Sequence, residues 1–182
     1  MLYFAYGSNL LKRRLQERTP AVRLVGKAVL YGHALRFHKR GDDGSGKCDA
    51  FYTGRQIDRI HGVLYSLGPG ERQILDDIEG VGCGYEISNV DVHTGSPTKA
   101  FTYVAQKHYI DHAMEPFGWY RNFVLAGALE HQFPNPYVQK IREVVFKEDP
   151  NHVRRAQNDA VIERAAIGLD PLSLRNGGST EL

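Results

Sequence analysis

The chain has 182 residues, a length that one domain accommodates, since domains usually take roughly 100 to 200. Its 42% hydrophobic and 24% charged residues are ordinary for a globular protein and exclude a disordered, collagen-like or coiled-coil chain as a whole. The formal net charge is +2. The basic runs at residues 12–14 and 38–40 are too short to predict a nucleic-acid-binding face, and we interpret both as solvated surface.

The two cysteines, Cys48 and Cys83, do not make a disulfide framework, and we expect both to be reduced. No apolar run approaches the roughly 18 residues of a membrane span, and the first residues lack the basic and apolar regions of a secretory signal. The sequence therefore predicts a cytoplasmic protein that does not enter a membrane.

The first half of the chain predicts several strands and few helices. Residues 2–6 are apolar on both faces, which indicates a buried strand, and Asn9 is placed to cap a helix that runs to about Arg18. Further strands are predicted at residues 23–30, 33–38, 50–53 and 60–67, with a flexible loop at 41–46.

The second half of the chain predicts one helix, then one hairpin and then two more helices. Ile74, Leu75 and Ile78 have helical spacing, and Gly80 ends that helix. Residues 85–93 and 99–105 predict a hairpin; a helix starts near Pro116, and another at about residue 138. Without regular strand–helix alternation, the class is α+β, with a mixed, barrel-like sheet and peripheral helices. We expect one domain over residues 1–168 and a flexible tail at 169–182.

The first candidate site is the turn after the first strand. The amides of Gly7, Ser8 and Asn9, with the hydroxyls of Tyr6 and Ser8, suit a carboxylate or an oxyanion. The alternative is that Ser8 or Asn9 only caps its own helix.

The second candidate site is the end of the helix before Gly80. Glu79 lies in the last turn, where the helix dipole disfavours a carboxylate, and Asp76 adds a like charge one turn earlier. Both effects favour proton uptake, as a general base requires. The alternative is an exposed acidic helix end.

Three other signals carry less weight. Cys83 has no local motif that would make it a nucleophile, so a packed thiol is the better interpretation. His108 and His112 lack the glutamate of a zincin motif, and no metal site is predicted. Trp119 and Tyr120 fit either the core or a pocket wall.

Three segments taken together carry a resemblance: Tyr-Gly-Ser-Asn-Leu at 6–10, Leu-Asp-Asp-Ile-Glu-Gly at 75–80 and Tyr-Arg-Asn-Phe-Val-Leu-Ala-Gly-Ala at 120–128. In this order and separation they resemble the gamma-glutamylcyclotransferase family over residues 2–141. The resemblance implies a small mixed α/β barrel-like fold, often dimeric, which allows a homodimer here. It also implies an enzyme of glutathione metabolism that converts a gamma-glutamyl compound to 5-oxoproline and a free amine, without a cofactor.

The resemblance also implies roles for individual residues. Glu79 would be the proton acceptor, and Tyr120 would contact the substrate. The gamma-glutamyl group would be held by the strand and turn, namely Tyr3, Phe4, Ala5, Tyr6, Gly7, Ser8 and Asn9. Two alternatives are a catalytically idle module that binds a gamma-glutamyl ligand and a cysteine-dependent amidohydrolase that uses Cys83.

Overall fold

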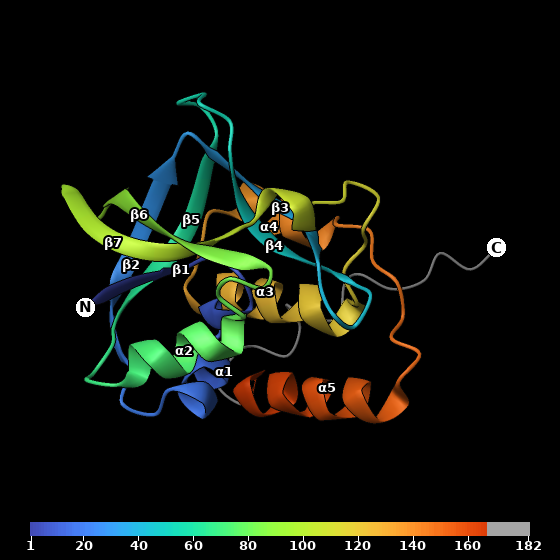
Figure 1. Cartoon of the computed structure of the whole chain (residues 1–182). Helices are drawn as coiled ribbons and strands as arrows, with labels where there is room; N and C mark the ends of the chain where they lie inside the picture. The colour runs from blue at the N-terminus through green and yellow to red at the C-terminus, as the bar shows by residue number, and fades with distance from the viewer. Residues whose placement is uncertain (167–182) are drawn as a thin grey trace.

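The computed structural model describes residues 1–166, in which five strands close into a barrel (Figure 1). Around the barrel the order is β1-β5-β2-β6-β7. The strands are β1 (Leu2–Ala5), β2 (Arg23–Tyr31), β5 (Arg59–Ser66), β6 (Tyr85–His93) and β7 (Pro97–Ala105). The predicted α+β class with a mixed barrel is confirmed, and the predicted tail at 169–182 lies outside the described residues.

Strand β1 is enclosed by neighbours on both edges. It pairs antiparallel with β5, where Tyr3 lies opposite Tyr65, and parallel with β7, where Tyr3 lies opposite Phe101. Phe4 and Ala5 are fully buried. The apolar run at the start of the sequence is therefore a strand inside the sheet, as predicted, and its end leads directly to the candidate site.

A separate two-stranded sheet, β3 (His33–Arg40) and β4 (Gly46–Tyr52), packs beside the barrel. Strand β4 begins four residues before the strand predicted at 50–53, since Gly46 and Lys47 pair with Arg40 and Lys39. The Asp49 carboxylate accepts a hydrogen bond of 2.7 Å from the Ala105 amide and so ties β4 to β7.

The helices lie outside the sheets, with α1, α2 and α5 on one side of the molecule (Figure 1), and α3 packs against η1, α4 and α5. Helix α4 begins before residue 138, where the sequence predicts its start, and includes Pro136 in its first turn, where proline is tolerated. Helix α5 was not predicted, because its largely polar sequence lacks an apolar stripe. The helical elements are η1 (Ser8–Leu10), α1 (Lys12–Arg18), α2 (Glu71–Glu79), η2 (Lys107–Tyr109), α3 (Gly118–Glu130), α4 (Asn135–Arg142) and α5 (His152–Ala166).

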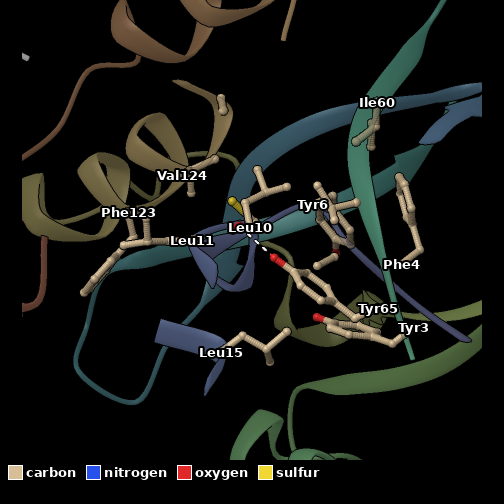
Figure 2. Packing of buried hydrophobic residues seen from close by; sticks show 14 of the residues in the cluster. Tyr3, Phe4, Tyr6, Leu10, Leu11, Leu15, Ile60, Tyr65, Phe123 and Val124 are labelled. Atoms are coloured by element: carbon tan, nitrogen blue, oxygen red, sulfur yellow. Dashed lines mark hydrogen bonds between the residues drawn. The ribbon is translucent and has the colours of Figure 1, made fainter. Parts of the chain in front are cut away.

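The core joins the barrel to α3 through the turn that follows β1. Figure 2 shows Leu10 and Leu11 between the barrel side chains and those of α3, and the Tyr65 hydroxyl donates a hydrogen bond of 3.2 Å to the Leu10 carbonyl. Helix α3 comes close enough to this turn that a Cβ atom at Gly127 would lie 2.4 Å from Leu10 Cβ. Because Gly127 has no side chain, α3 and the turn can pack this closely together.

Within residues 1–166, no helix is both long and apolar enough to cross a membrane.

Candidate active site

The turn after β1 is a short 3₁₀ helix, η1, followed by α1. The prediction that Asn9 caps α1 is wrong, because that helix begins at Lys12 after Leu11 and has no side-chain cap. The side chain of Asn9 instead points to the end of α2. Within residues 1–166, the amides of Gly7, Ser8 and Asn9 donate to no protein acceptor, which leaves three N–H groups for an anion.

Glu79 is the last residue of α2, as the sequence predicts. Gly80 follows in the left-handed conformation with φ of +67°, and its amide returns to the carbonyls of Asp76 and Asp77. A residue with a side chain would be strained at this φ. The glycine thus ends the helix sharply and leaves Glu79 at the helix end, facing the turn after β1.

One oxygen of the Glu79 carboxylate is held by two donors. Oε1 accepts hydrogen bonds of 3.0 Å from Asn9 Nδ2 and 2.9 Å from Arg18 Nη1, and Arg18 Nη1 also lies 2.9 Å from Asn9 Oδ1. The side chain of Glu79 is 17% exposed. Its other oxygen, Oε2, contacts no donor among residues 1–166 and retains its lone pairs for a ligand.

The charges around Glu79 differ from the sequence expectation. The Asp76 carboxylate, expected to add a like charge, is occupied by Arg72 at 2.8 Å and by the Tyr103 hydroxyl at 2.6 Å. Arg18, which the sequence analysis did not single out, forms the ion pair with Glu79. Its position at the end of the helix after the turn gave no sign of this contact, because α1 and α2 are far apart in sequence.

A small pocket lies between the turn and the end of α2, with about 280 Å³ of empty space including its open mouth. Phe4 and Ala5, which the family resemblance placed against the substrate, do not line it, and both are fully buried. The lining residues are Tyr3, Tyr6, Gly7, Ser8, Asn9, Cys48, Glu79, Tyr85, Tyr103 and Tyr120. The structure therefore brings the turn, Glu79 and Tyr120 together and adds Cys48, Tyr85 and Tyr103.

Two tyrosines of the pocket hold the backbone of β4. The Tyr120 hydroxyl accepts a hydrogen bond of 3.0 Å from the Cys48 amide, and the Tyr85 hydroxyl donates one of 2.6 Å to the Cys48 carbonyl. Burial raises the pKa of both hydroxyls well above the ordinary value, so both stay protonated at neutral pH. These two uncharged side chains line the same pocket as the turn after β1.

Neither cysteine has the surroundings of a nucleophile. Cys83 is exposed and does not line the pocket, and no histidine or carboxylate among residues 1–166 is hydrogen-bonded to its thiol. Cys48 lines the pocket, but burial raises the pKa of its thiol. Because the thiolate is the reactive form, this pocket disfavours cysteine chemistry.

His108 and His112, for which no metal site is predicted, lie in different segments and do not form a pair. His108 lies in η2, whereas His112 lies beyond that helix and contacts His38, with 3.2 Å between the two Nδ1 atoms. No group of three or more histidine, cysteine or carboxylate side chains in the described part of the chain could hold a metal ion.

The interpretation of residues 38–40 as solvated surface is wrong for two of the three. His38 is 5% exposed and Lys39 is 6% exposed. His38 pairs with the buried Asp49 at 2.9 Å. The β3–β4 sheet folds these two side chains inward, a contact between strands that composition alone does not reveal.

The closed five-stranded barrel with its surrounding helices is a gamma-glutamylcyclotransferase-like fold. A solved structure of a gamma-glutamyl cyclotransferase has the same fold, with a TM-score of 0.79 and 24% identity over 90% of this chain and 98% of that one. Residues 59–141 match the AIG2-like family.

The curated proteins to which the sequence is similar are also gamma-glutamylcyclotransferases. The chain is 28% identical to human gamma-glutamylcyclotransferase over 153 residues, 79% of this chain and 78% of the relative. It is 26% identical to the mouse gamma-glutamylcyclotransferase over 179 residues, 94% of this chain and 91% of the relative. The chain is thus similar, as a distant homologue over most of its length, to the gamma-glutamylcyclotransferases.

Proposed function

We propose that this protein is a gamma-glutamyl cyclotransferase with Glu79 as the proton acceptor. The observation that carries the proposal is the state of the Glu79 carboxylate. Oε1 is fixed by Asn9 and Arg18, while Oε2 has no partner within residues 1–166. Glu79 lines a pocket together with Gly7, Ser8 and Asn9, whose amides also have no partner in this range. A base that is held in place by one oxygen can accept a proton on the other.

The reaction needs no group beyond the substrate and the protein. The substrate's α-amino nitrogen attacks its own γ-carbonyl carbon, the new C–N bond closes a five-membered ring, and the γ-amide C–N bond breaks. Because the nucleophile is tethered to the carbon that it attacks, proximity accounts for much of the acceleration. Glu79 takes the proton that the attacking amine loses and returns it to the leaving amine.

The amides of Gly7, Ser8 and Asn9 face the anionic part of the reacting molecule. They suit either the α-carboxylate of the glutamyl group or the oxyanion that develops on the γ-carbonyl. In the second case, loss of one donor would cost on the order of 10²–10³ in rate. The neutral wall of tyrosines would then orient the rest of the substrate.

The test is release of 5-oxoproline by Glu79→Gln, assayed on a panel of gamma-glutamyl amino acids, gamma-glutamyl amines and glutathione. Glutamine retains an oxygen that Asn9 and Arg18 can bind, but it is not a base at neutral pH. We expect a loss of about 10²–10⁴-fold in kcat. Asp77→Asn is the matched control, because Asp77 lies two residues before Glu79 in α2 and is exposed.

The products separate this proposal from its alternatives. A wild-type protein that binds a gamma-glutamyl ligand but releases no product is an idle binding module. Release of glutamate in place of the cyclic lactam, with inactivation by iodoacetamide, would indicate a cysteine amidohydrolase. Retention of more than about a tenth of the rate by Glu79→Gln contradicts the assigned base.

A further inference from the structure

A second and larger pocket lies between β3, the start of β5 and α4, with a volume of about 600 Å³. Pockets of roughly 300–1,000 Å³ commonly hold small molecules. Within residues 1–166, this pocket and the candidate active site have no lining residue in common. The proposed cyclisation therefore makes no use of it, and its chemistry can be considered by itself.

The walls of the second pocket are largely apolar. They include Leu35 and Phe37 of β3, and Tyr137 and Ile141 of α4. Ile57, in the loop before β5, also lines the pocket and is 80% exposed. Apolar side chains that gather at an open cavity form a surface that a ligand with an apolar body would cover.

Three positively charged side chains line the same pocket. They are Arg36 of β3, Arg59 of β5 and Lys140 of α4, and all three are exposed. None of these side chains forms an ion pair or a hydrogen bond with any of residues 1–166. The carboxylate of Asp58 lines the pocket too, but both of its oxygens accept hydrogen bonds of 2.9 Å from Arg55. The described part of the pocket therefore carries an excess of positive charge.

The cross-strand neighbour of Arg36 does not neutralise it. Asp49 lies opposite Arg36 in the β3–β4 register and is buried. Its carboxylate is already occupied, because one oxygen accepts a hydrogen bond of 2.7 Å from the Ala105 amide and the other lies 2.9 Å from Nε2 of His38. The positive charge of Arg36 is left for an anion from outside the described chain.

The apolar walls and the positive charges together define the kind of ligand. Charges of one sign around apolar walls focus the electric field and raise the local concentration of the opposite ion. A bare inorganic anion would leave the apolar walls in contact with water. A neutral apolar molecule would leave three positive charges without a partner. A molecule with an apolar part and an anionic part satisfies both features of the pocket.

We propose that this pocket binds a small amphiphilic anion, a molecule with an apolar or aromatic body that carries a carboxylate or a phosphate. The body lies against Phe37 and Tyr137, and the anionic group is bound by Arg36, Arg59 and Lys140. The site is independent of the proposed cyclotransferase function, because none of these residues lines the candidate active site.

The experiment uses two fluorescent probes that differ in one group. The first, 8-anilinonaphthalene-1-sulfonate, has an aromatic body and an anionic sulfonate, and the second, N-phenyl-1-naphthylamine, is the same molecule without the sulfonate. We expect the wild-type protein to bind both, the sulfonate probe at one saturable site. The double variant Arg36→Gln/Lys140→Gln should weaken binding of the sulfonate probe by about 5- to 30-fold, as expected for two exposed charge contacts, and change binding of the neutral probe by less than about threefold.

A second variant tests the apolar part of the site. Ile57→Asp removes an apolar contact at a position that is 80% exposed, and so leaves the core intact. We expect it to weaken binding of both probes by about fivefold or more. The matched control is Val153→Asp on α5, where the side chain is 68% exposed. The control for the loss of two charges is Arg23→Gln/Lys27→Gln, since both residues are exposed on β2.

The variants also define the results that would overturn the proposal. Unchanged binding of the sulfonate probe by Arg36→Gln/Lys140→Gln would do so, as would an equal loss in Arg23→Gln/Lys27→Gln, which would mean that net charge attracts the probe. Binding of neither probe by the wild-type protein would also overturn it. A dimer that Ile57→Asp dissociates would then identify a second copy of the chain as the occupant of this face.

Discussion

Gly127 offers a direct test of how the fold positions the turn after β1, which we propose binds an anion. In Gly127→Ala the new Cβ would lie 2.4 Å from Leu10 Cβ and 2.7 Å from both the Leu10 carbonyl carbon and the Leu11 amide nitrogen. Carbon atoms in contact are ordinarily about 3.5 Å apart or more. Either α3 or the turn must therefore move by about 1 Å, and two of the three contacts are backbone atoms that cannot rotate away.

Two effects on stability oppose each other in this variant. Alanine is favoured over glycine inside a helix by about 1 kcal/mol, whereas overpacking a core costs about 1–3 kcal/mol. Because the contacts involve backbone, we place the cost at the upper end and expect a net loss of about 1–2 kcal/mol in the free energy of unfolding. Displacement of the turn should also lower kcat/KM for a gamma-glutamyl substrate by about 10- to 100-fold.

Urea unfolding followed by circular dichroism measures the first effect, and 5-oxoproline release measures the second. The matched control is Gly26→Ala on β2, where a Cβ atom meets nothing within 4 Å. We expect this variant to unfold at the wild-type midpoint or above. A Gly127→Ala protein that is as stable as the wild type and equally active would refute the reasoning, since it would show that α3 does not set the position of the turn.

Two further predictions concern the pocket. Asn9→Ala removes the hydrogen bonds from Asn9 to Glu79 and Tyr3, and we expect kcat to fall by about 10- to 100-fold because the base is then held by Arg18 alone; an unchanged kcat would argue against this positioning role. Burial raises the pKa of Tyr6, Tyr85 and Tyr120 above that in the unfolded chain, so their contribution to stability is complete below about pH 10 and is lost as the pH rises further. The urea midpoint should be constant from pH 8 to 9 and decline above about pH 10. Tyrosinate absorbance should appear together with unfolding. Ionisation of these residues near pH 10 in a folded protein would contradict their burial.

Several features followed from local sequence because local physics fixes them. A strand that is apolar on both faces, as at residues 2–6, removes its side chains from water only when it is buried. Gly80 is suited to the left-handed conformation that ends α2. Glu79 at the last helical turn followed from the same glycine. The family resemblance then related this carboxylate to the turn at residues 6–10.

Other features depended on contacts that no local pattern reports. The local sequence predicts a helix cap at Asn9. Its side chain instead donates a hydrogen bond to Glu79, 70 residues away in sequence. Helix α5 is largely polar, and it is held by packing on α3 and by the ion pair of Arg154 with the buried Asp149. Hydrophobic periodicity cannot detect a helix of this kind.

The sequence by itself determined the class of fold, the strand before the turn at residues 6–10 and the place of Glu79 at a helix end, because strand burial, glycine conformation and helix ends are local properties. Only the tertiary structure determined which charged side chains form ion pairs with one another. It paired Glu79 with Arg18, occupied Asp76 with Arg72, and buried Lys39, which forms no ion pair within residues 1–166. The energy of a charge depends on distance and burial, and both are set by segments that the chain brings together only on folding.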